Sequence, residues 1–424
     1  MKKILILSTL LAIAFASWAQ DEKIEYVDDE SCGCELVFID GIQTTQDGEY
    51  FGFKREDGTV IVPNIFQFVD RFHGEFCKVY LGYDSCGLIN RDGAQVIPCE
   101  YTDIAYPTDG MILVQQGDYF GYFDTLGMQK IPFRYRAAST FNEGLAVVAI
   151  DIDSHYVSYG YIDHNGDIAI PPQYEYANPF YEGYAVVKAY DRYGMIDKQN
   201  REVFPIKYEF VTPMYEGLLF AGDDDGLAMY NNKFEQLTQP IYTQLIGKSG
   251  DRILVARDGL YGYLDTKGKE VIPCQYEVAT LFKDDRAAVM KGGKWGIINS
   301  KGKVILPIEY DNNGHRSEAY LYHDGLALIQ KDNLFGYCDM DGNIVIIPCF
   351  TNAYQFSDGL APVELGGWGY IDTTGEMFIP PVFDIASPFE WGRAEVIYRG
   401  ETHKMNTQGR CVKNCKNAPK SWRK

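Results

Sequence analysis

The chain has few of the residues that most catalytic and nucleic-acid-binding sites need. It contains six histidines in 424 residues, and none lies in an HExxH or similar metal-ligand spacing. No nucleophile elbow, phosphate loop or dinucleotide fingerprint is present. Lysine and arginine number 39 against 59 acidic residues, a net charge of −20, and so acidic a chain is a poor nucleic-acid binder. We therefore expect no catalytic residue, no cofactor, no metal ion and no nucleic-acid partner.

Apolar runs are equally scarce, and the longest one lies at the N-terminus. Residues 1–19 have a charged start at Lys2 and Lys3, an apolar segment from Ile4 to Ala16, and a small-x-small site at 17–19. This pattern predicts a secretory signal peptide. An uncleaved membrane anchor is the less favoured alternative, since a spanning helix needs roughly 20 apolar residues. We expect a mature chain from Gln20, without stable membrane insertion, exported to the periplasm or the extracellular space.

No other stretch has a long apolar period of 3.6 residues, but glycine recurs at intervals of 32 to 40 residues. A fixed period of this size indicates an array of repeats. The lead glycines of ten repeats are Gly52, Gly87, Gly121, Gly160, Gly194, Gly226, Gly262, Gly296, Gly336 and Gly369.

Three further positions recur after each lead glycine. Six residues on, glycine or asparagine predicts a turn with positive φ: Gly58, Gly93, Gly127, Gly166, Asn200, Asn232, Gly268, Gly302, Gly342 and Gly375. Eleven residues on, proline predicts the end of the second strand: Pro63, Pro98, Pro132, Pro171, Pro205, Pro273, Pro307 and Pro380, with Pro348 one residue late and Leu237 in the sixth repeat. Three residues after the proline, an aromatic ring is expected to pack between neighbouring repeats: Phe66, Tyr101, Tyr135, Tyr174, Tyr208, Tyr276, Tyr310, Phe350 and Phe383.

The residue before the lead glycine is aromatic in eight repeats, as in Lys294-Trp295-Gly296 and Gly367-Trp368-Gly369. In this the chain resembles the WG-repeat (KWG-type) family of bacteria over residues 50–410. The sixth repeat departs most, with Asp225 before Gly226. The resemblance implies an all-β repeat scaffold and supplies no catalytic residues.

Strand formers, tight turns and acidic-Gly pairs alternate within each repeat, which predicts an antiparallel meander of three or four short strands. The expected fold is an all-β, propeller-like array, with an open twisted β-solenoid as the alternative. We expect a lead-in or cap at 20–49, about ten repeats at 50–410 and a basic tail at 411–424. The irregular sixth repeat is a candidate point of division near residue 225.

The ten cysteines allow disulfides in an exported chain. Cys99, Cys274 and Cys349 share the position after proline in separate repeats and are expected to be buried small hydrophobes. Cys32 and Cys34 lie near one end of the array, and Cys411 and Cys415 near the other. We hypothesise that at least one disulfide joins the two ends. A four-thiolate metal site is the alternative, although the spacings differ from the common CxxC pairs.

The remaining polar candidates have plainer explanations. The recurring aspartates Asp124, Asp163, Asp197, Asp265, Asp339 and Asp372 occupy one position of the repeat, which favours capping of a turn over paired-carboxylate catalysis. The stretch 339–343 resembles the start of a calcium loop but lacks the later glutamate. His315 and His323 share an insertion at 312–323, and a second insertion lies at 151–158. Either is a candidate binding loop, or a solvated loop without function.

The function predicted from these observations is that of an exported, non-catalytic scaffold that binds a protein or a glycan. The abundance of tyrosine fits such a surface. A cell-envelope hydrolase, or an accessory domain of an enzyme, is the alternative. Binding predicts several exposed aromatic side chains in a row, whereas catalysis predicts one pocket with convergent carboxylates or histidines.

Overall fold

The computed structural model describes residues 24–29, 34–151, 157–311, 322–419 and 422, with backbone alone at 24–38 and at 417. The chain divides into two compact units, chiefly Glu35–Pro240 (unit 1) and Ile241–Lys424 (unit 2). The division between them falls at the end of the sixth repeat.

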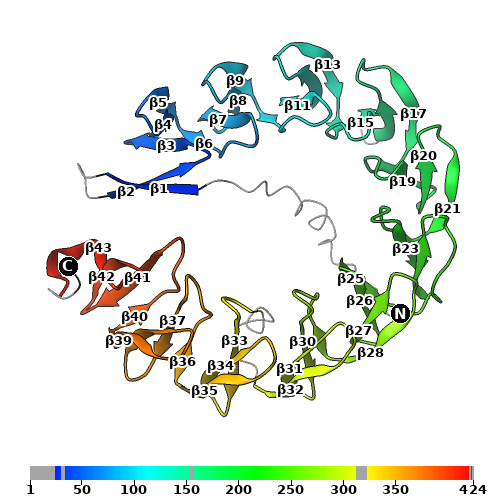
Figure 1. The fold of residues 1–424 in the computed structure, drawn as a ribbon. Coiled ribbons are helices and arrows are strands. Elements are labelled where there is room, and N and C mark those ends of the chain that lie inside the picture. The colour runs from blue at the N-terminus through cyan, green and yellow to red at the C-terminus, as the bar shows by residue number, and fades with distance from the viewer. Residues whose placement is uncertain (1–23, 30–33, 152–156, 312–321, 420–421, 423–424) are drawn as a thin grey trace. The chain divides into compact units, whose positions relative to one another are not determined.

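The described residues of both units form small antiparallel sheets of three to five strands, in chain order (Figure 1). In unit 1 the strands are β1 (Ile24–Asp29), β2 (Cys34–Ile39), β3 (Ile42–Asp47), β4 (Tyr50–Arg55), β5 (Val60–Phe66), β6 (Phe68–Val69), β7 (Phe76–Gly82), β8 (Ser85–Asn90), β9 (Gln95–Tyr101), β10 (Asp103–Ile104), β11 (Met111–Gln116), β12 (Tyr119–Asp124), β13 (Gln129–Tyr135), β14 (Ala137–Ala138), β15 (Ala146–Asp151), β16 (Val157–Ile162), β17 (Ile168–Tyr174), β18 (Tyr176–Ala177), β19 (Tyr184–Ala189), β20 (Arg192–Asp197), β21 (Glu202–Tyr208), β22 (Phe210–Val211), β23 (Leu218–Asp223) and β24 (Gly226–Asn231).

Unit 2 continues the same succession. Its elements are β25 (Gln244–Ser249), β26 (Arg252–Arg257), β27 (Leu260–Asp265), β28 (Glu270–Tyr276), β29 (Val278–Ala279), β30 (Ala287–Lys291), β31 (Lys294–Ile298), β32 (Val304–Tyr310), β33 (Leu326–Lys331), β34 (Leu334–Asp339), β35 (Ile344–Phe350), β36 (Asn352–Ala353), β37 (Leu360–Glu364), β38 (Trp368–Asp372), β39 (Met377–Phe383), β40 (Ile385–Ala386), β41 (Arg393–Tyr398), β42 (Glu401–Asn406), β43 (Cys411–Lys413) and the 3-10 turn η3 (Cys415–Asn417).

A typical sheet is a four-stranded meander such as β10-β11-β12-β13. A two-residue first strand is followed by a central hairpin, β11–β12, and then by a seven-residue outer strand, β13. The lead glycine lies on the second strand of the central hairpin. The predicted all-β array of meander repeats is confirmed, and each sheet has the strand order of a propeller blade.

The prediction that proline ends a strand is wrong, because the proline lies inside the outer strand. Pro132 is the fourth residue of β13. Tyr122 pairs with Ile131 and Phe120 pairs with Tyr135, so four residues of β13 span two residues of β12. Proline fits this position because a β-bulge on an edge strand does not need its missing N–H.

The bulge explains the lead glycine, whose role was not evident in the sequence. A Cβ atom on Gly121 would lie 2.7 Å from the carbonyl oxygen of Ile131, and one on Gly262 would lie 2.5 Å from the amide nitrogen of Cys274. The backbone of the bulge therefore occupies the space of a side chain. The same close approach occurs at Gly52, Gly87, Gly160, Gly194, Gly296, Gly336 and Gly369.

The sixth repeat lacks this bulged outer strand, and its lead residue is Ala228 rather than Gly226. Ala228 pairs with Ala221, as Gly262 pairs with Val255 in the next repeat. The turn residue with positive φ is accordingly Phe234, not Asn232. Beyond the central hairpin, sheet β22-β23-β24 continues only as an isolated bridge between Tyr230 and Gln236, so no bulged outer strand lies over Ala228. With Ala228 as lead residue, the spacings on either side are both 34 residues.

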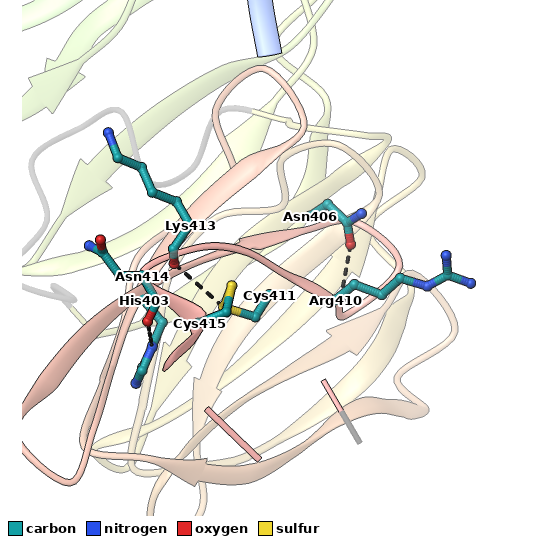
Figure 2. Close-up of a disulfide and its surroundings, with 7 residues drawn as sticks. All are labelled: His403, Asn406, Arg410, Cys411, Lys413, Asn414 and Cys415. Carbon is teal, nitrogen blue, oxygen red and sulfur yellow. Dashed lines mark hydrogen bonds between the residues drawn. A yellow bond between two sulfur atoms is a disulfide. The ribbon is translucent and has the colours of Figure 1, made fainter. Parts of the chain in front are cut away.

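An eleventh sheet, β40-β41-β42-β43, follows the ten repeats marked by glycine. His403 pairs with Val396 at the position of the lead glycine. Its outer strand has only three residues and no proline, so again no bulge covers the lead residue. The side chain of His403 is buried, and Nδ1 lies 2.8 Å from the carbonyl oxygen of Asn414 (Figure 2).

The structure joins Cys411 to Cys415 in a disulfide beside this last strand (Figure 2). The hypothesis of a disulfide between the two ends of the array is therefore wrong, since both C-terminal sulfurs are bonded to each other. Cys32 and the side chain of Cys34 lie outside the described residues. The four-thiolate metal site loses two of its four ligands for the same reason.

Aromatic side chains pack between neighbouring sheets, as predicted. Tyr101 of β9 contacts Phe123 of the next sheet, with ring centroids 5.6 Å apart. The aromatic residue before the lead glycine lies opposite this ring, as in the cross-strand pair of Trp368 and Phe383. Such pairs contribute roughly 0.2–1 kcal/mol beyond an alanine pair.

Several tyrosines that suggested a binding surface are instead part of the core. Tyr122, one residue after Gly121, is fully buried, and its hydroxyl donates to the carbonyl oxygen of Ser139 at 2.7 Å. A tyrosine can be buried in a core without an unsatisfied polar group when its hydroxyl has such a partner. The same bond, to the carbonyl 17 residues later, is made by Tyr161, Tyr263, Tyr337 and Tyr370.

The recurring aspartates cap turns, as predicted. Oδ1 of Asp124 accepts the amide N–H groups of Leu126 at 3.0 Å and Met128 at 2.8 Å. The bond from Met128 lowers the pKa of Asp124. Asn231 takes the same role in the sixth repeat, accepting from Lys233 and Glu235. These turns therefore need the carboxylate or amide oxygen for their own backbone.

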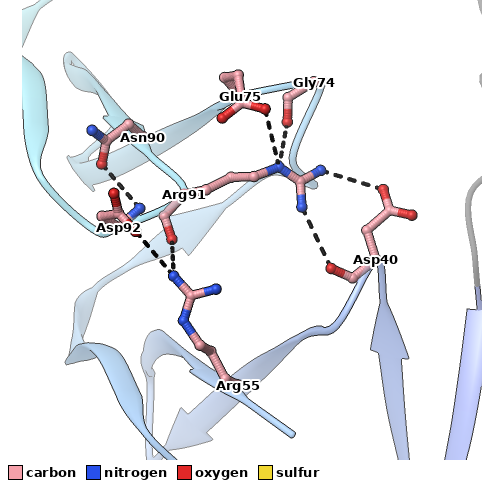
Figure 3. Close-up of polar contacts among 7 residues, drawn as sticks. All are labelled: Asp40, Arg55, Gly74, Glu75, Asn90, Arg91 and Asp92. Atoms are coloured by element: carbon pink, nitrogen blue, oxygen red, sulfur yellow. Dashed lines mark hydrogen bonds and ion pairs between the residues drawn. The ribbon is translucent and has the colours of Figure 1, made fainter.

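Acidic turns also join neighbouring sheets. The carboxylate of Asp109 accepts the N–H of Gly144 at 2.9 Å, and that of Asp358 accepts the N–H of Gly392 at 2.7 Å. Near the start of unit 1, Arg91 donates to the carbonyl oxygen of Gly74 at 2.7 Å and pairs with Asp40 at 3.3 Å (Figure 3). These contacts therefore link each sheet to the next.

A candidate binding surface on the hairpin tips

The inserted loops predicted as binding sites fall largely outside the described residues, at 152–156 and 312–321. His155 and His315 lie in these segments. His323 is described, and burial lowers its pKa. Within the described ranges, no group of three or more histidine, cysteine or acidic residues is arranged to hold a metal ion.

The three cysteines that follow proline are less uniform than expected. Cys99 and Cys274 are half-buried, whereas Cys349 is exposed, so the expectation of burial is wrong for Cys349. Burial raises the pKa of the thiols of Cys99 and Cys274. Protonated thiols are poor nucleophiles and poor metal ligands.

Two acidic stretches, 339–343 and 223–225, are explained by the turns in which they lie. Asp339 caps its turn, accepting the N–H groups of Asp341 at 2.9 Å and Asn343 at 2.8 Å, so the resemblance of 339–343 to a calcium loop is accounted for by the repeat. The acidic run 223–225 forms the end of the hairpin β23–β24, where the N–H of Asp225 donates to Asp223.

One end of the sheets differs strongly between the two units. We define a tip as the last residue of the first central strand and the three residues that follow it. The described tips of unit 1 are 47–50, 82–85, 116–119, 189–192 and 223–226, and those of unit 2 are 257–260, 291–294, 331–334, 364–367 and 398–401. The hairpin β15–β16 is left out, because 152–156 lie outside the described residues.

Four tips of unit 1 present a tyrosine next to an acidic residue. Tyr83 and Tyr190 are 88% and 94% exposed, and Tyr50 and Tyr119 are 47% and 42% exposed. Their acidic neighbours are Glu49, Asp84, Asp118 and Asp191, all exposed. The tips of unit 2 contain one tyrosine, Tyr398, which is half-buried and has no acidic residue next to it in the chain. Aromatic rings that keep one face in water are typical of binding surfaces.

Charge separates the two sets of tips as well. The described tips of unit 1 hold eight acidic residues and one basic residue, Arg192, whereas those of unit 2 hold four acidic and five basic residues. The tip surface of unit 1 is therefore both aromatic and strongly acidic. It offers flat rings and carboxylates to a partner.

Neighbouring side chains show how such a surface holds a cation. The guanidinium carbon of Arg136 lies 5.4 Å from the ring centroid of Tyr119, and Arg136 also pairs with Asp118 at 3.4 Å. Lys188 lies 5.6 Å from the ring of Tyr193 and pairs with Asp191 at 2.5 Å. The hydrogen bond to Asp191 raises the pKa of Lys188.

Sequence reasoning predicted exposed aromatics in a row without naming them. The sequence does contain a local signal that could have identified them. It is a tyrosine directly beside an acidic residue, within a glycine- or aspartate-containing turn between two apolar strands. The tyrosines after the lead glycine lack that acidic neighbour on the turn, and they are buried.

The chain forms, within the described ranges, no helix with the length and apolar character of a membrane span. No curated protein matches the sequence. Similar solved structures include BamB from Moraxella catarrhalis, with 13% identity, a TM-score of 0.31, and coverage of 64% of this chain and 92% of that chain. The extracellular domain of a one-component system from B. thetaiotaomicron has 12% identity and a TM-score of 0.25, covering 92% of this chain and 71% of that chain. Likeness at this level says nothing about what the chain binds.

The family model for the WG-containing repeat matches eight segments of the chain. The matched residues are 87–119, 120–151, 159–192, 193–225, 261–295, 295–335, 335–367 and 368–400. They omit 226–260, the stretch that holds Ala228 and the unbulged sheet. The matches cover more than half of the chain and coincide with the meander repeats seen in the structure. The chain therefore belongs to the family of WG-containing repeat proteins.

Proposed function

We propose that this protein is an exported, non-catalytic scaffold that binds a protein or glycan partner through the tip surface of unit 1. The observation that carries the proposal is the tyrosine–acid pair at four tips of unit 1, at 47–50, 82–85, 116–119 and 189–192, against none at the tips of unit 2. Exposed tyrosines add large, rigid contact area at low entropic cost. Export is supported by the signal-peptide pattern of residues 1–19.

The repeats themselves support a scaffold. The residues that recur, namely the lead glycine, the proline, the aromatics and the capping aspartates, all have partners within the array. A solenoid or blade array presents an extended surface whose affinity comes from residues that depart from the repeat. The tip tyrosines are such departures, since their exposure is not needed by the meander.

Glycan and peptide arrays probed with the purified full chain test this proposal. We expect at least one class of ligand to bind, and binding to fall in Tyr83→Ala and Tyr190→Ala. Leu365→Ala, at a tip of unit 2, is the matched control and should bind as the wild type does. Absence of any ligand, together with hydrolysis of a cell-envelope substrate, would overturn the proposal in favour of an enzyme.

A further inference from the structure

The tips of unit 1 fall into two kinds. At 116–119 and 189–192, the acidic residues Asp118 and Asp191 are paired with Arg136 and Lys188 of the same chain. At 47–50 and 82–85, the structure shows no cation over Tyr50 or Tyr83 and no ion pair of Glu49 or Asp84 among the residues it describes. The carboxylate is thus engaged at two tips, at one of which Arg136 also lies over Tyr119, and ring and carboxylate are both open at the other two.

Each open tip places an exposed ring close to acidic residues in the chain. Tyr83 packs against Phe68, with ring centroids 5.8 Å apart, and is 88% exposed. Tyr50 opens β4 and lies opposite Asp47 in the hairpin β3–β4, and Glu49 directly precedes it. An exposed ring and a carboxylate can both attract the same cation.

Charge complementarity selects the partner. The chain carries a net charge of −20, and the tips of unit 1 are its most acidic run of loops. An acidic partner would be repelled, and a neutral glycan would leave the carboxylates without partners. A basic polypeptide would satisfy both the rings and the carboxylates, in the manner that Arg136 already does at Tyr119.

We propose that the tips 47–50 and 82–85 bind lysine or arginine side chains of an extended, basic polypeptide segment, an inference that rests on the function proposed above. The two tips belong to successive sheets, β1-β2-β3-β4-β5 and β6-β7-β8-β9. Packed sheets lie roughly 10 Å apart, and an extended chain rises about 3.3 Å per residue. Basic residues about three positions apart would therefore reach both tips.

Fluorescence anisotropy with the full chain and a fluorescein-labelled peptide tests the inference. The peptide has lysine at every third position and glycine or serine between, and its counterpart has glutamate in place of lysine. We expect only the lysine peptide to bind, with an affinity that falls as salt is raised, because exposed charges are screened. In Glu49→Gln/Asp84→Asn and in Tyr50→Ala/Tyr83→Ala, Kd should rise about tenfold.

The matched control is Asp332→Asn, which removes an acidic residue from a tip of unit 2 and should leave Kd unchanged. Equal thermal midpoints would show that each variant is folded. Equal binding of the lysine and glutamate peptides, or wild-type affinity in both double variants, would overturn the inference. A neutral glycan that binds in a Tyr83-dependent way, without lysine-peptide binding, would overturn the basic partner but keep the proposed function. Binding of neither ligand would overturn both.

Discussion

Nine repeats have an outer strand whose bulge lies over the lead residue, and two sheets, at the sixth repeat and at the C-terminal end, do not. Glycine occupies the lead position in all nine bulged repeats, whereas Ala228 and His403 occupy it in the other two. The lead glycine is therefore required by the backbone of the bulge that lies over it. A turn or a positive φ does not explain it, since the hairpin turns have glycines of their own.

The comparison also separates architecture from recognition. Residues that the bulge and the turns require recur in both units, whereas the exposed tyrosines occur on the tips of unit 1 only. A position that recurs in every repeat is explained by packing of the repeat. A position that differs between units, such as Tyr83 in unit 1 and Leu365 in unit 2, is free to serve binding.

The largest expected effect comes from adding a methyl group under a bulge. In Gly194→Ala, the new Cβ would lie 2.6 Å from the backbone nitrogen and Cα of Ile206, so the bulge must move. We expect a loss of about 3 kcal/mol, or roughly 6–12 °C in the melting temperature of unit 1. Differential scanning calorimetry measures it.

Its counterpart in the sixth repeat is Ala228→Gly, which should cost about 1 kcal/mol through lost burial and greater chain entropy. A Gly194→Ala variant as stable as the wild type, or an Ala228→Gly variant as damaged as Gly194→Ala, would break the comparison.

A smaller effect is expected at the residue after the lead position. Tyr161→Phe removes the hydroxyl that donates to the carbonyl oxygen of Asn178 at 2.7 Å in a fully buried site. The orphaned carbonyl should cost about 1–2 kcal/mol, measured as a lower urea midpoint for unit 1. The sixth repeat has Met229 there, and Met229→Leu should cost less, because the volume is kept and no hydrogen bond is lost. Equal losses would show that the hydroxyl contributes nothing.

The smallest effect concerns the turn caps and appears only in acid. The pKa of Asp124 is lowered in the folded chain by the N–H of Met128, so its contribution to stability is full above the unfolded pKa and is lost as pH falls through the folded pKa. Asp124→Asn keeps an accepting oxygen, as Asn231 does in the sixth repeat. Melting curves from pH 7 to pH 3 should show a slightly smaller acid loss in the variant. An unchanged acid loss would assign it to other carboxyl groups.

The prediction from sequence succeeded in the regular repeats, where a turn residue acts through its own backbone preference. Gly127 and Gly375 adopt the predicted positive φ, and Asp124 and Asp372 cap the predicted turns. Prediction failed at Pro132, because both a strand end and a bulge accept proline. It also failed at Gly226, because the lead position of the sixth repeat holds Ala228, and the glycine two residues before it was taken for the lead residue. The tip tyrosines were not singled out, since exposure of Tyr83 and burial of Tyr122 depend on which side of a strand or turn each lies.

The sequence by itself determined the period, the all-β meander and the turn positions, because these follow from local φ preferences and strand propensity within about 34 residues. The tertiary structure alone decided why the lead residue is glycine, that the C-terminal cysteines pair with each other, and which tyrosines face solvent. Each of these depends on the approach of two backbones or two side chains across strands, and no spacing along the chain records that distance.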